Sequence, residues 1–344
     1  MQTTLKPANL VESTRVHRDV YVDPAIYALE MDRVFRRAWL YVGHESEIPK
    51  AGDYALTRLG PDEVILVRRD GGGLALLHNR CAHRGAAIVT EARGNVKLFR
   101  CPYHAWAYRL DGHLAAVPMR EGYPPEFDLN DPANSLAPVP RVASYRGFIF
   151  ASHAADGPDL PTFLSGLASA LDNMVDRAPA GTITHVGGKL RMEYRGNWKL
   201  FMENATDLVH PGFVHASSVA AVRASPEAFK ADTDTAQTAQ MLLSNGLTTA
   251  EFDRLPLVAY GSGHHYMGGF YRDGVIALDR ADPVFDRYRA LLIAAHGETK
   301  TAEILAVDRF NNLIWPNISV NSRFAVLRHV QPIAVDRTII TSQC

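Results

Sequence analysis

Two short clusters of cysteine and histidine are the residues of this chain with the clearest chemistry. The stretch CAHRG at 81–85 holds Cys81 and His83, and CPYHAW at 101–106 holds Cys101 and His104. Two thiolates and two imidazoles in two pairs are an ordinary ligand set for a structural zinc ion. The same set can hold a [2Fe–2S] cluster, with two cysteines on one iron and two histidines on the other.

The residues around the two pairs favour the iron–sulfur cluster. Gly85 follows the first pair and Pro102 lies inside the second, as expected of loops between β-strands. Two loops that face each other can each supply one cysteine and one histidine. Glycine lets backbone N–H groups approach the sulfides, and such hydrogen bonds tune the potential of a cluster. Trp106 is expected to pack beneath the loop rather than to take part in chemistry.

A second candidate metal site lies in the segment NWKLFMENATDLVHPGFVHASS, at 197–218. Asp207 and His210 are three residues apart, so they share one face if the segment is helical. His215 would lie on another face of a continuous helix, but the Pro-Gly pair between the histidines is expected to kink the helix and bring His215 back. Two converging histidines with a carboxylate nearby suggest part of a 2-His-1-carboxylate site for non-haem Fe(II). The alternative is a helix whose histidines cap it or pair with carboxylates.

Composition limits the other function classes. The chain has 344 residues, 47% of them hydrophobic and 21% charged, and a net charge of −1. These values predict a soluble globular protein of two domains, with no nucleic-acid or membrane partner. No apolar run reaches 18 residues, and the start shows no signal peptide. If two of the three cysteines are ligands, no disulfide framework is possible, which favours the cytoplasm.

Local patterns place the two candidate sites in different kinds of domain. Asp23-Pro24 predicts the start of an N-terminal helix. Short β-rich runs separated by turn signals follow from about 39 to 152 and predict a small antiparallel β domain. A linker at 153–161 and a helix marked by Leu164, Leu167 and Leu171 come next. The last predictions are strands near 182–196, 264–271, 312–320, 323–331 and 335–342, with helices near 283–307, which together suggest an α+β domain.

The stretch from Asn79 to Leu114, NRCAHRG…CPYHAWAYRLDGHL, closely resembles the Rieske iron–sulfur signature. Together with the segment at 197–215, it resembles the α (oxygenase) subunit of the Rieske non-haem iron ring-hydroxylating oxygenases. Trp315-Pro316-Asn317 also fits the later core of that family. The resemblance implies an α+β fold: a Rieske antiparallel β domain plus a helix-grip (START-like) antiparallel-sheet catalytic domain. It implies an N-terminal helical segment at 1–38 packing on the catalytic domain, a Rieske domain at 39–155 and a catalytic domain at 156–344.

The resemblance also implies roles for the candidate residues. Cys81 and Cys101 would ligate one iron of a Rieske cluster, and His83 and His104 the other. His210 and His215 would bind a mononuclear Fe(2+), with Asn204 as a further catalytic residue. Asp207 would link His210 to His104 of a neighbouring subunit, fixing both tautomers and giving electrons a short path. A head-to-tail ring, usually a trimer, follows from that link.

The function implied is an oxygenase of aromatic catabolism. Electrons from NAD(P)H would pass through a separate reductase, with or without a ferredoxin, to the Rieske cluster and then to the mononuclear iron, where O₂ is activated beside an aromatic substrate. The product would be a cis-dihydrodiol or a phenol. An O- or N-demethylating monooxygenase is the alternative within the family, and a Rieske electron-transfer protein or a zinc-stabilised binding module is the alternative outside it. A small β subunit, giving α3β3, accompanies many dihydroxylating relatives.

Substrate contacts are expected from the same segment and from the later strands. Pocket candidates are Phe201, Met202, Asn204, Leu208, Val209, Phe213, His264 or His265, and Arg323. An arginine on these strands would suit an aromatic carboxylate through a bidentate contact. Core packing is the more common fate of the apolar candidates.

The third iron ligand is where the sequence departs from the family. The facial triad needs a carboxylate, which in the family comes from an aspartate well downstream, whereas this chain closes with VDRTIITSQC. Neither Asp308 nor Asp336 matches the family position, and Glu203 fits better as a supporting residue. We therefore expect a C-terminally truncated fragment of a longer subunit, which lacks the third ligand and a closing helix and binds mononuclear iron weakly.

Overall fold

The computed structural model describes residues 7–185, 188–207, 209–224, 248–268, 283–307, 309–322 and 325–344. The chain forms two compact units. The first consists of Met1–Phe163, Thr184–Trp198 and His329–Thr341, and the second of Leu164–Ile183, Lys199–Arg328 and Ser342–Cys344. Two of the expected residues, Leu208 and Arg323, lie outside the described part of the chain, as does Asp308.

The N-terminal helix begins where its sequence predicts. The side chain of Asp23 accepts a hydrogen bond from the N–H of Ala25 at 2.7 Å, and α2 (Pro24–Glu30) follows with proline at its first position. A π-helical turn, η2 (Met31–Phe35), continues it. Phe35 is buried and meets the ring of Trp198 edge-on, with 4.9 Å between ring centroids. Before the helix lie η1 (Pro7–Asn9), the β1–β2 hairpin (Val11–Glu12 and Arg15–Val16) and α1 (Asp19–Val22).

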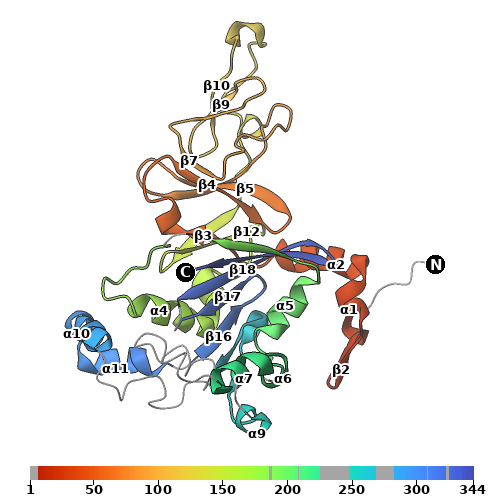
Figure 1. The fold of residues 1–344 in the computed structure, drawn as a ribbon. Coiled ribbons are helices and arrows are strands. Elements are labelled where there is room, and N and C mark those ends of the chain that lie inside the picture. Colours follow the sequence, from red (N-terminus) through yellow and green to blue (C-terminus); the bar gives the residue numbers. More distant parts are fainter. Residues whose placement is uncertain are drawn as a thin grey trace. The chain divides into compact units, whose positions relative to one another are not determined.

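The first unit contains three small antiparallel sheets, as the β-rich runs predict (Figure 1). One has the order β6-β5-β4-β7: Leu74–His78, Asp62–Arg68, Asp53–Leu59 and Arg93–Asn95. The second has the order β11-β12-β3: Arg141–Tyr145, Phe148–Ser152 and Leu40–His44. The third has the order β10-β9-β8: Leu114–Ala116, Ala107–Tyr108 and Phe99–Arg100. Short 3-10 turns lie between them: η3 (Glu45–Glu47), η4 (Arg120–Gly122) and η5 (Pro132–Asn134).

A buried polar cluster in the first unit has no counterpart in the sequence predictions. The carboxylate of Glu47 is hydrogen-bonded to Lys189 and accepts from the N–H of His44 at 3.0 Å. The ring of His185 stacks on that of His44, with 5.1 Å between centroids. Burial lowers the pKa of His44 to about 4, and burial also lowers the pKa of His329 to about 4. Both imidazoles are therefore neutral at pH 7.

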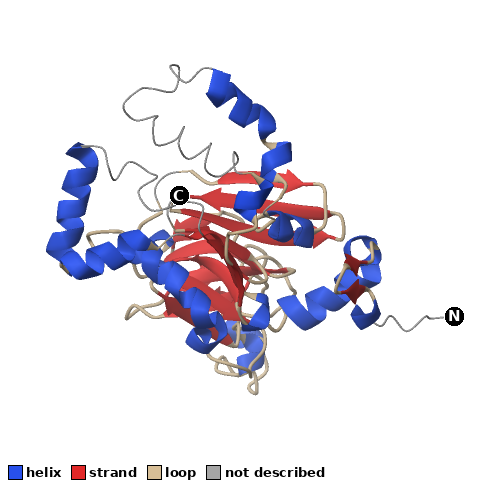
Figure 2. Cartoon of the chain, turned by 90° about the horizontal axis from the view of Figure 1, so that it is seen from below, coloured by secondary structure: helices blue, strands red, loops and turns tan. Residues whose placement is uncertain are grey.

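The largest sheet has seven strands in the order β13-β19-β18-β17-β16-β15-β14. Their bounds are Leu190–Tyr194, Arg337–Gln343, Val326–Ala334, Ile318–Asn321, Arg309–Ile314, His265–Gly268 and Leu257–Ala259. Helix α3 (Leu160–Leu164) belongs to the first unit except for Leu164. The helices of the second unit are η6 (Ser165–Leu167), α4 (Ala168–Asp176), α5 (Trp198–Asn204, from Lys199 on), α6 (Pro211–Val214), α7 (Ala216–Ala224), α9 (Thr249–Phe252), η8 (Gly261–Gly263), α10 (Pro283–His296) and α11 (Glu298–Ala306). Figure 2 colours these elements by type. The α+β fold predicted from the sequence is confirmed, and none of the described helices has the length and apolarity to cross a membrane.

The two faces of strands β15–β17 contact different elements of the second unit. On one face, Arg309 donates to the Ser169 hydroxyl at 2.7 Å, and the hydroxyl of Ser322 donates to Ala170 O at 2.9 Å. This face therefore packs on α4, where Leu171 is buried as its helical spacing predicts. On the other face, Asn311 donates to Ala205 O, in the segment that carries the second metal-site candidates.

Candidate metal centres

The two Cys/His loops share one backbone hydrogen-bond pattern. In the first, the N–H of Cys81 donates to Ala86 O at 2.8 Å and the N–H of Gly85 donates to Cys81 O at 2.9 Å. In the second loop, the N–H of Cys101 donates to Trp106 O at 2.8 Å, and the N–H of Ala105 donates to Cys101 O at 3.0 Å. In each loop, both the backbone N–H and the backbone C=O of the cysteine therefore form a hydrogen bond that closes the loop. The first loop follows strand β6 and the second follows strand β8.

The fourth residue after each cysteine adopts the left-handed conformation. Gly85 has φ 76° and Ala105 has φ 55°. Glycine adopts this conformation without a steric penalty, whereas alanine is strained there. The glycine that marks the first loop thus has a backbone role, and the second loop has the same turn without a glycine.

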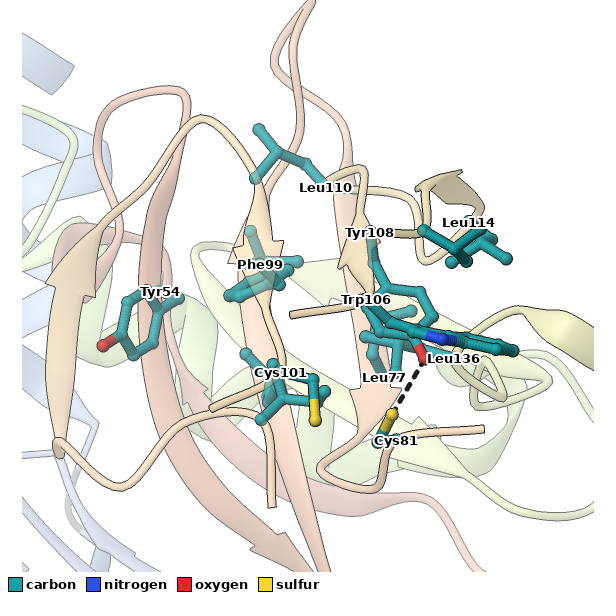
Figure 3. Packing of buried hydrophobic residues seen from close by; sticks show 14 residues of the cluster. Tyr54, Leu77, Cys81, Phe99, Cys101, Trp106, Tyr108, Leu110, Leu114 and Leu136 are labelled. Atoms are coloured by element: carbon teal, nitrogen blue, oxygen red, sulfur yellow. Dashed lines mark hydrogen bonds between the residues drawn. The ribbon is translucent and has the colours of Figure 1, made fainter. Parts of the chain in front are cut away.

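The side chains of the loops are arranged as a two-thiol, two-imidazole site. Cys81 and Cys101 are buried at 3% and 2% exposure, and Figure 3 shows them at one end of the buried cluster. The rings of His83 and His104 lie 4.8 Å apart between centroids. Trp106 is buried, as expected, and its indole stacks on His83 at 4.9 Å. This donor set fits a Rieske [2Fe–2S] cluster, because the thiols and the imidazoles form separate pairs.

Two buried side chains hold the first loop. The amide of Asn79 accepts from the N–H groups of Ile88 and Val89 at 2.8 and 3.0 Å and donates to Glu63 at 2.7 Å. The Tyr108 hydroxyl lies 3.0 Å from the sulfur of Cys81, the bond dashed in Figure 3. Burial raises the pKa of Tyr108 above its ordinary value, and the hydrogen bond with Cys81 is the next largest cause of the rise, so the hydroxyl keeps its proton.

The segment with the second candidate site is not the kinked helix that the sequence predicts. Helix α5 ends at Asn204, residues 205–207, 209 and 210 belong to no helix or strand, and α6 begins at Pro211. Proline is therefore the first residue of a new helical turn and not a kink inside an old one, because its fixed φ suits that position. His210 and His215 flank this one-turn helix at its two ends, and their rings lie 5.5 Å apart between centroids. The sequence predicts correctly that the two histidines converge, but it places them on a kinked helix, whereas they lie at the two ends of a separate one-turn helix.

Asp207 approaches His210 through a turn instead of a shared helix face. Its carboxylate accepts from the N–H groups of Val209 and His210 at 2.8 and 3.3 Å. Aspartate favours such local bonds over helix. The other carboxylate oxygen lies 3.5 Å from His210 Nδ1. The side-chain amide nitrogen of Asn204 lies 3.3 Å from His210 Nε2, so Nε2 is the unprotonated ring nitrogen in this contact, and its lone pair is the one that an iron would take. These contacts fit a metal-binding imidazole held by Asp207.

The third ligand is not among the residues that converge here. Within the described ranges, no third His, Cys, Asp or Glu side chain joins His210 and His215 in a group that could hold a metal ion. Asp336 lies in the turn between β18 and β19, and Glu203 is exposed on α5. The histidine pair thus supplies two ligands of a facial site.

The pocket candidates have separate environments. Met202 is fully buried, whereas Val209 and Phe213 are exposed at 54% and 69%. His264 is fully buried and its Nδ1 accepts from the N–H of Trp315 at 3.0 Å. His265, its neighbour, instead lies on the strand face that contacts Thr206, at 3.0 Å. Phe201 is half-buried on α5.

Comparison with known proteins agrees with both centres. Residues 38–141 match the Rieske [2Fe-2S] domain, and residues 183–344 match the catalytic domain of the ring-hydroxylating alpha subunit. The chain is 33% identical over 342 residues to the anthranilate 1,2-dioxygenase large subunit of Acinetobacter baylyi, covering 96% of this chain and 68% of that subunit. The chain belongs to the ring-hydroxylating dioxygenase α subunits.

Two other comparisons show the range of this α-subunit family. The α subunit of N,N-dimethyl phenylurea N-demethylase from Sphingobium is 42% identical over 200 residues, which cover 58% of this chain and 43% of that one. A naphthalene 1,2-dioxygenase structure with indole bound in its active site matches with a TM-score of 0.78 at 26% identity, over 100% of this chain and 74% of that one. As an α subunit of this family, the protein is an oxidoreductase that uses a Rieske [2Fe–2S] cluster and a mononuclear iron.

Sequence reasoning about this α subunit missed the polar residues that support its two centres. Asn79 and Tyr108 are ordinary strand and loop residues in sequence, and their partners lie at sequence distances of 10 and 27. Asn311 and Ser319 in strands β16 and β17 are buried. In the sequence, Asn311 and Ser319 stand out only as polar residues within apolar strands. The sequence alone does not show which face of the sheet such a residue points to.

Proposed function

We propose that this α subunit is the oxygenase component of a multicomponent system that hydroxylates an aromatic ring, with cis-dihydroxylation as the expected outcome. The observation that carries the proposal is the presence of two different centres in one chain. One is the pair of loops around Cys81 and Cys101, and the other is the histidine pair at His210 and His215. The cluster would supply single electrons, and the mononuclear iron would supply dioxygen activation.

The first centre receives electrons from a partner in this proposal. Cys81 and Cys101 hold one iron and His83 and His104 the other. The side chain of His83 is exposed and that of His104 is half-buried, whereas both thiols are buried. The imidazole side is thus the accessible one, and a reductase, with or without a ferredoxin, would deliver NAD(P)H-derived electrons there.

Asp207 is the proposed link between centres of neighbouring subunits. Its carboxylate is 48% exposed although one oxygen is bound to two backbone N–H groups. The second oxygen, near His210 Nδ1, can also accept from an imidazole of another chain. Such a carboxylate between His210 and a partner's Rieske histidine would hold both rings in one tautomer. A head-to-tail homotrimer, or α3β3 with a small β subunit, provides that contact. Asn204, whose amide nitrogen lies at Nε2, would lie beside an iron bound to that nitrogen.

The substrate proposed is a small aromatic compound, with aromatic carboxylates as the first candidates. One relative, which matches 96% of this chain, is named as the large subunit of an anthranilate 1,2-dioxygenase, and anthranilate is an aromatic carboxylate. Arg323, proposed to bind the carboxylate, lies outside the described residues. The division into an N-terminal segment at 1–38, a Rieske domain at 39–155 and a catalytic domain at 156–344, and a cytoplasmic location, are part of the same proposal.

Product analysis tests the function. The enzyme, with its reductase and NADH, is given ¹⁸O₂ and a panel of benzoates, phthalates and neutral arenes. We expect a product that carries both atoms of one O₂ molecule. Reduction and reoxidation of the Rieske cluster without any oxygenated product from the panel would instead indicate an electron-transfer protein.

A demethylating monooxygenase is the second candidate, favoured by the 42% identity to the N-demethylase subunit over 200 residues. The same assay with N,N-dimethyl phenylurea distinguishes it. Release of formaldehyde, with one oxygen atom incorporated and no ring diol, would favour demethylation.

A further inference from the structure

Three neighbouring strands present one polar face to the histidine-bearing segment. In the antiparallel register, Met267 of β15 pairs with Asn311 of β16, and His265 pairs with Leu313. Leu313 in turn pairs with Ser319 of β17. Because paired residues point to the same side of a sheet and alternate along each strand, Asn311 and Ser319 share this face.

Two contacts show which way the face points. The Asn311 amide nitrogen donates to Ala205 O at 2.5 Å, and the Thr206 hydroxyl meets His265 Nε2 at 3.0 Å. Ala205 and Thr206 directly precede Asp207. The face that carries Asn311 therefore lies beside the segment that holds the proposed iron ligands.

Two acceptor atoms on this face are buried without a partner. Asn311 is 5% exposed and Ser319 is fully buried. Within the described part of the chain, neither Asn311 Oδ1 nor Ser319 Oγ has a hydrogen-bond partner. Only the amide nitrogen can donate to Ala205 O, so the orientation of the Asn311 amide is fixed and its oxygen points elsewhere.

The nearest polar ring cannot supply the missing donor. His265 Nδ1 donates to Gly263 O at 2.9 Å, because a carbonyl can only accept. In the neutral ring this leaves Nε2 as an acceptor, which the Thr206 hydroxyl satisfies. His265 therefore offers no free N–H to Asn311.

We infer that the substrate of this enzyme carries a hydrogen-bond-donating ring substituent, an amino or hydroxyl group, that binds Asn311 Oδ1 with Ser319 Oγ beside it. The inference rests on the proposed function and specifies its substrate class. A buried acceptor that remains unpaired is costly, and a site built to pair with a donor rejects analogues that lack it. A methyl group or a carboxylate has no proton to offer at neutral pH, so neither satisfies this amide oxygen.

A pair of ligands with similar shape tests the inference without turnover. The enzyme with both iron centres loaded is titrated anaerobically with 2-aminobenzoate and with 2-methylbenzoate. The amino and methyl groups are similar in size, and the two ligands share the carboxylate. We expect 2-aminobenzoate to bind about fivefold to tenfold more tightly. Aniline and toluene, compared in the same way, should keep the order without the carboxylate.

Variants assign the preference to named atoms. Asn311→Ala should bring the ratio of the two dissociation constants to about one, and Ser319→Ala should reduce it about twofold to threefold. Asn312→Ala is the matched control. Asn312 is an equally buried asparagine on the same strand, but it pairs with Tyr266 and Val320 on the opposite face. Its substitution should leave the ratio unchanged.

Each outcome decides the question. Equal binding of the two ligands by the unaltered enzyme, a preference for the methyl compound, or an unchanged ratio in Asn311→Ala would overturn the inference. If Asn311→Ala lost its fold by circular dichroism, Ser319→Ala would carry the test, since its hydroxyl has no partner in the described structure. The binding ratio needs no oxygenation, so failure of the ¹⁸O₂ assay with the expected ratio would reject the proposed function alone.

Discussion

Replacing Tyr108 by phenylalanine should lower the reduction potential of the Rieske cluster. The Tyr108 hydroxyl lies 3.0 Å from the Cys81 sulfur, and both residues are buried. When Cys81 is a thiolate ligand, the hydroxyl donates to a sulfur that becomes more negative on reduction. The hydrogen bond is then stronger in the reduced state and favours that state. Phenylalanine keeps the ring in place and removes only this donor.

The magnitude follows from the strength of the bond. A hydrogen bond to a charged group contributes about 1.5–3 kcal/mol. If about half of that differs between the two oxidation states, the change is about 1 kcal/mol. For a one-electron couple, 59 mV corresponds to about 1.4 kcal/mol. We therefore expect Tyr108→Phe to lower the potential by about 40 mV.

A redox titration followed by the EPR signal of the reduced cluster measures the shift. Tyr123→Phe is the control: the Tyr123 hydroxyl accepts from Trp106 Nε1 at 3.0 Å in the same core and bonds neither cysteine. Its potential should move by less than about 10 mV, because no donor to sulfur is lost. An unchanged or higher potential in Tyr108→Phe, or an equal shift in Tyr123→Phe, would refute the reasoning.

Three further predictions concern four substitutions. Asp207→Asn should leave Rieske reduction by the reductase intact and slow turnover about 100-fold or more, because asparagine cannot hold two imidazoles as acceptor; stopped-flow measurement of a near-normal rate would contradict the bridging role. The pKa of His329 is about 4 in the folded protein, below its value of 6.5 in the unfolded chain. The contribution of this neutral histidine to the free energy of unfolding is therefore fully present above pH 6.5 and is lost as the pH falls toward 4. Between pH 7.5 and 5.5, the free energy of unfolding of His329→Phe, measured by urea titration, should therefore fall by about 1.4 kcal/mol less than that of the unaltered protein. An identical fall in both proteins would contradict this. Ala105→Gly should stabilise the protein by about 1 kcal/mol, since φ 55° strains alanine, and Gly85→Ala should destabilise it similarly; opposite signs in denaturation would contradict the loop geometry.

The sequence predicted the features that depend on short-range pattern. Asp23 before Pro24 places a helix start within one turn, and the spacing of Leu164, Leu167 and Leu171 gives a helix face that the structure buries. The loop positions of the Cys/His pairs follow from turn residues beside β-rich runs. Each of these signals lies within a few residues of the feature it predicts.

The sequence could not predict features that depend on competition or on distant partners. Asp207 and His210 have a spacing that suits a helix, but the Asp207 carboxylate binds backbone N–H groups at 209 and 210 and stabilises a turn instead. Asn311 meets Ala205 across 106 residues, and only strand register shows that it shares a face with Ser319. The burial that lowers the pKa of His329 likewise arises from tertiary packing.

The matching backbone bonds of the two Cys/His loops have a consequence for cofactor assembly. The loops around Cys81 and Cys101 are closed by main-chain bonds that need no metal. Fixing one residue's backbone costs about 1–2 kcal/mol in conformational entropy, and these bonds offset part of that cost through main-chain atoms alone. Main-chain bonds of this kind reduce the conformational entropy that binding the cluster would cost, so more of its binding energy would be retained as affinity. A substitution that removes one of these bonds should accordingly weaken cluster retention even though it changes no ligand.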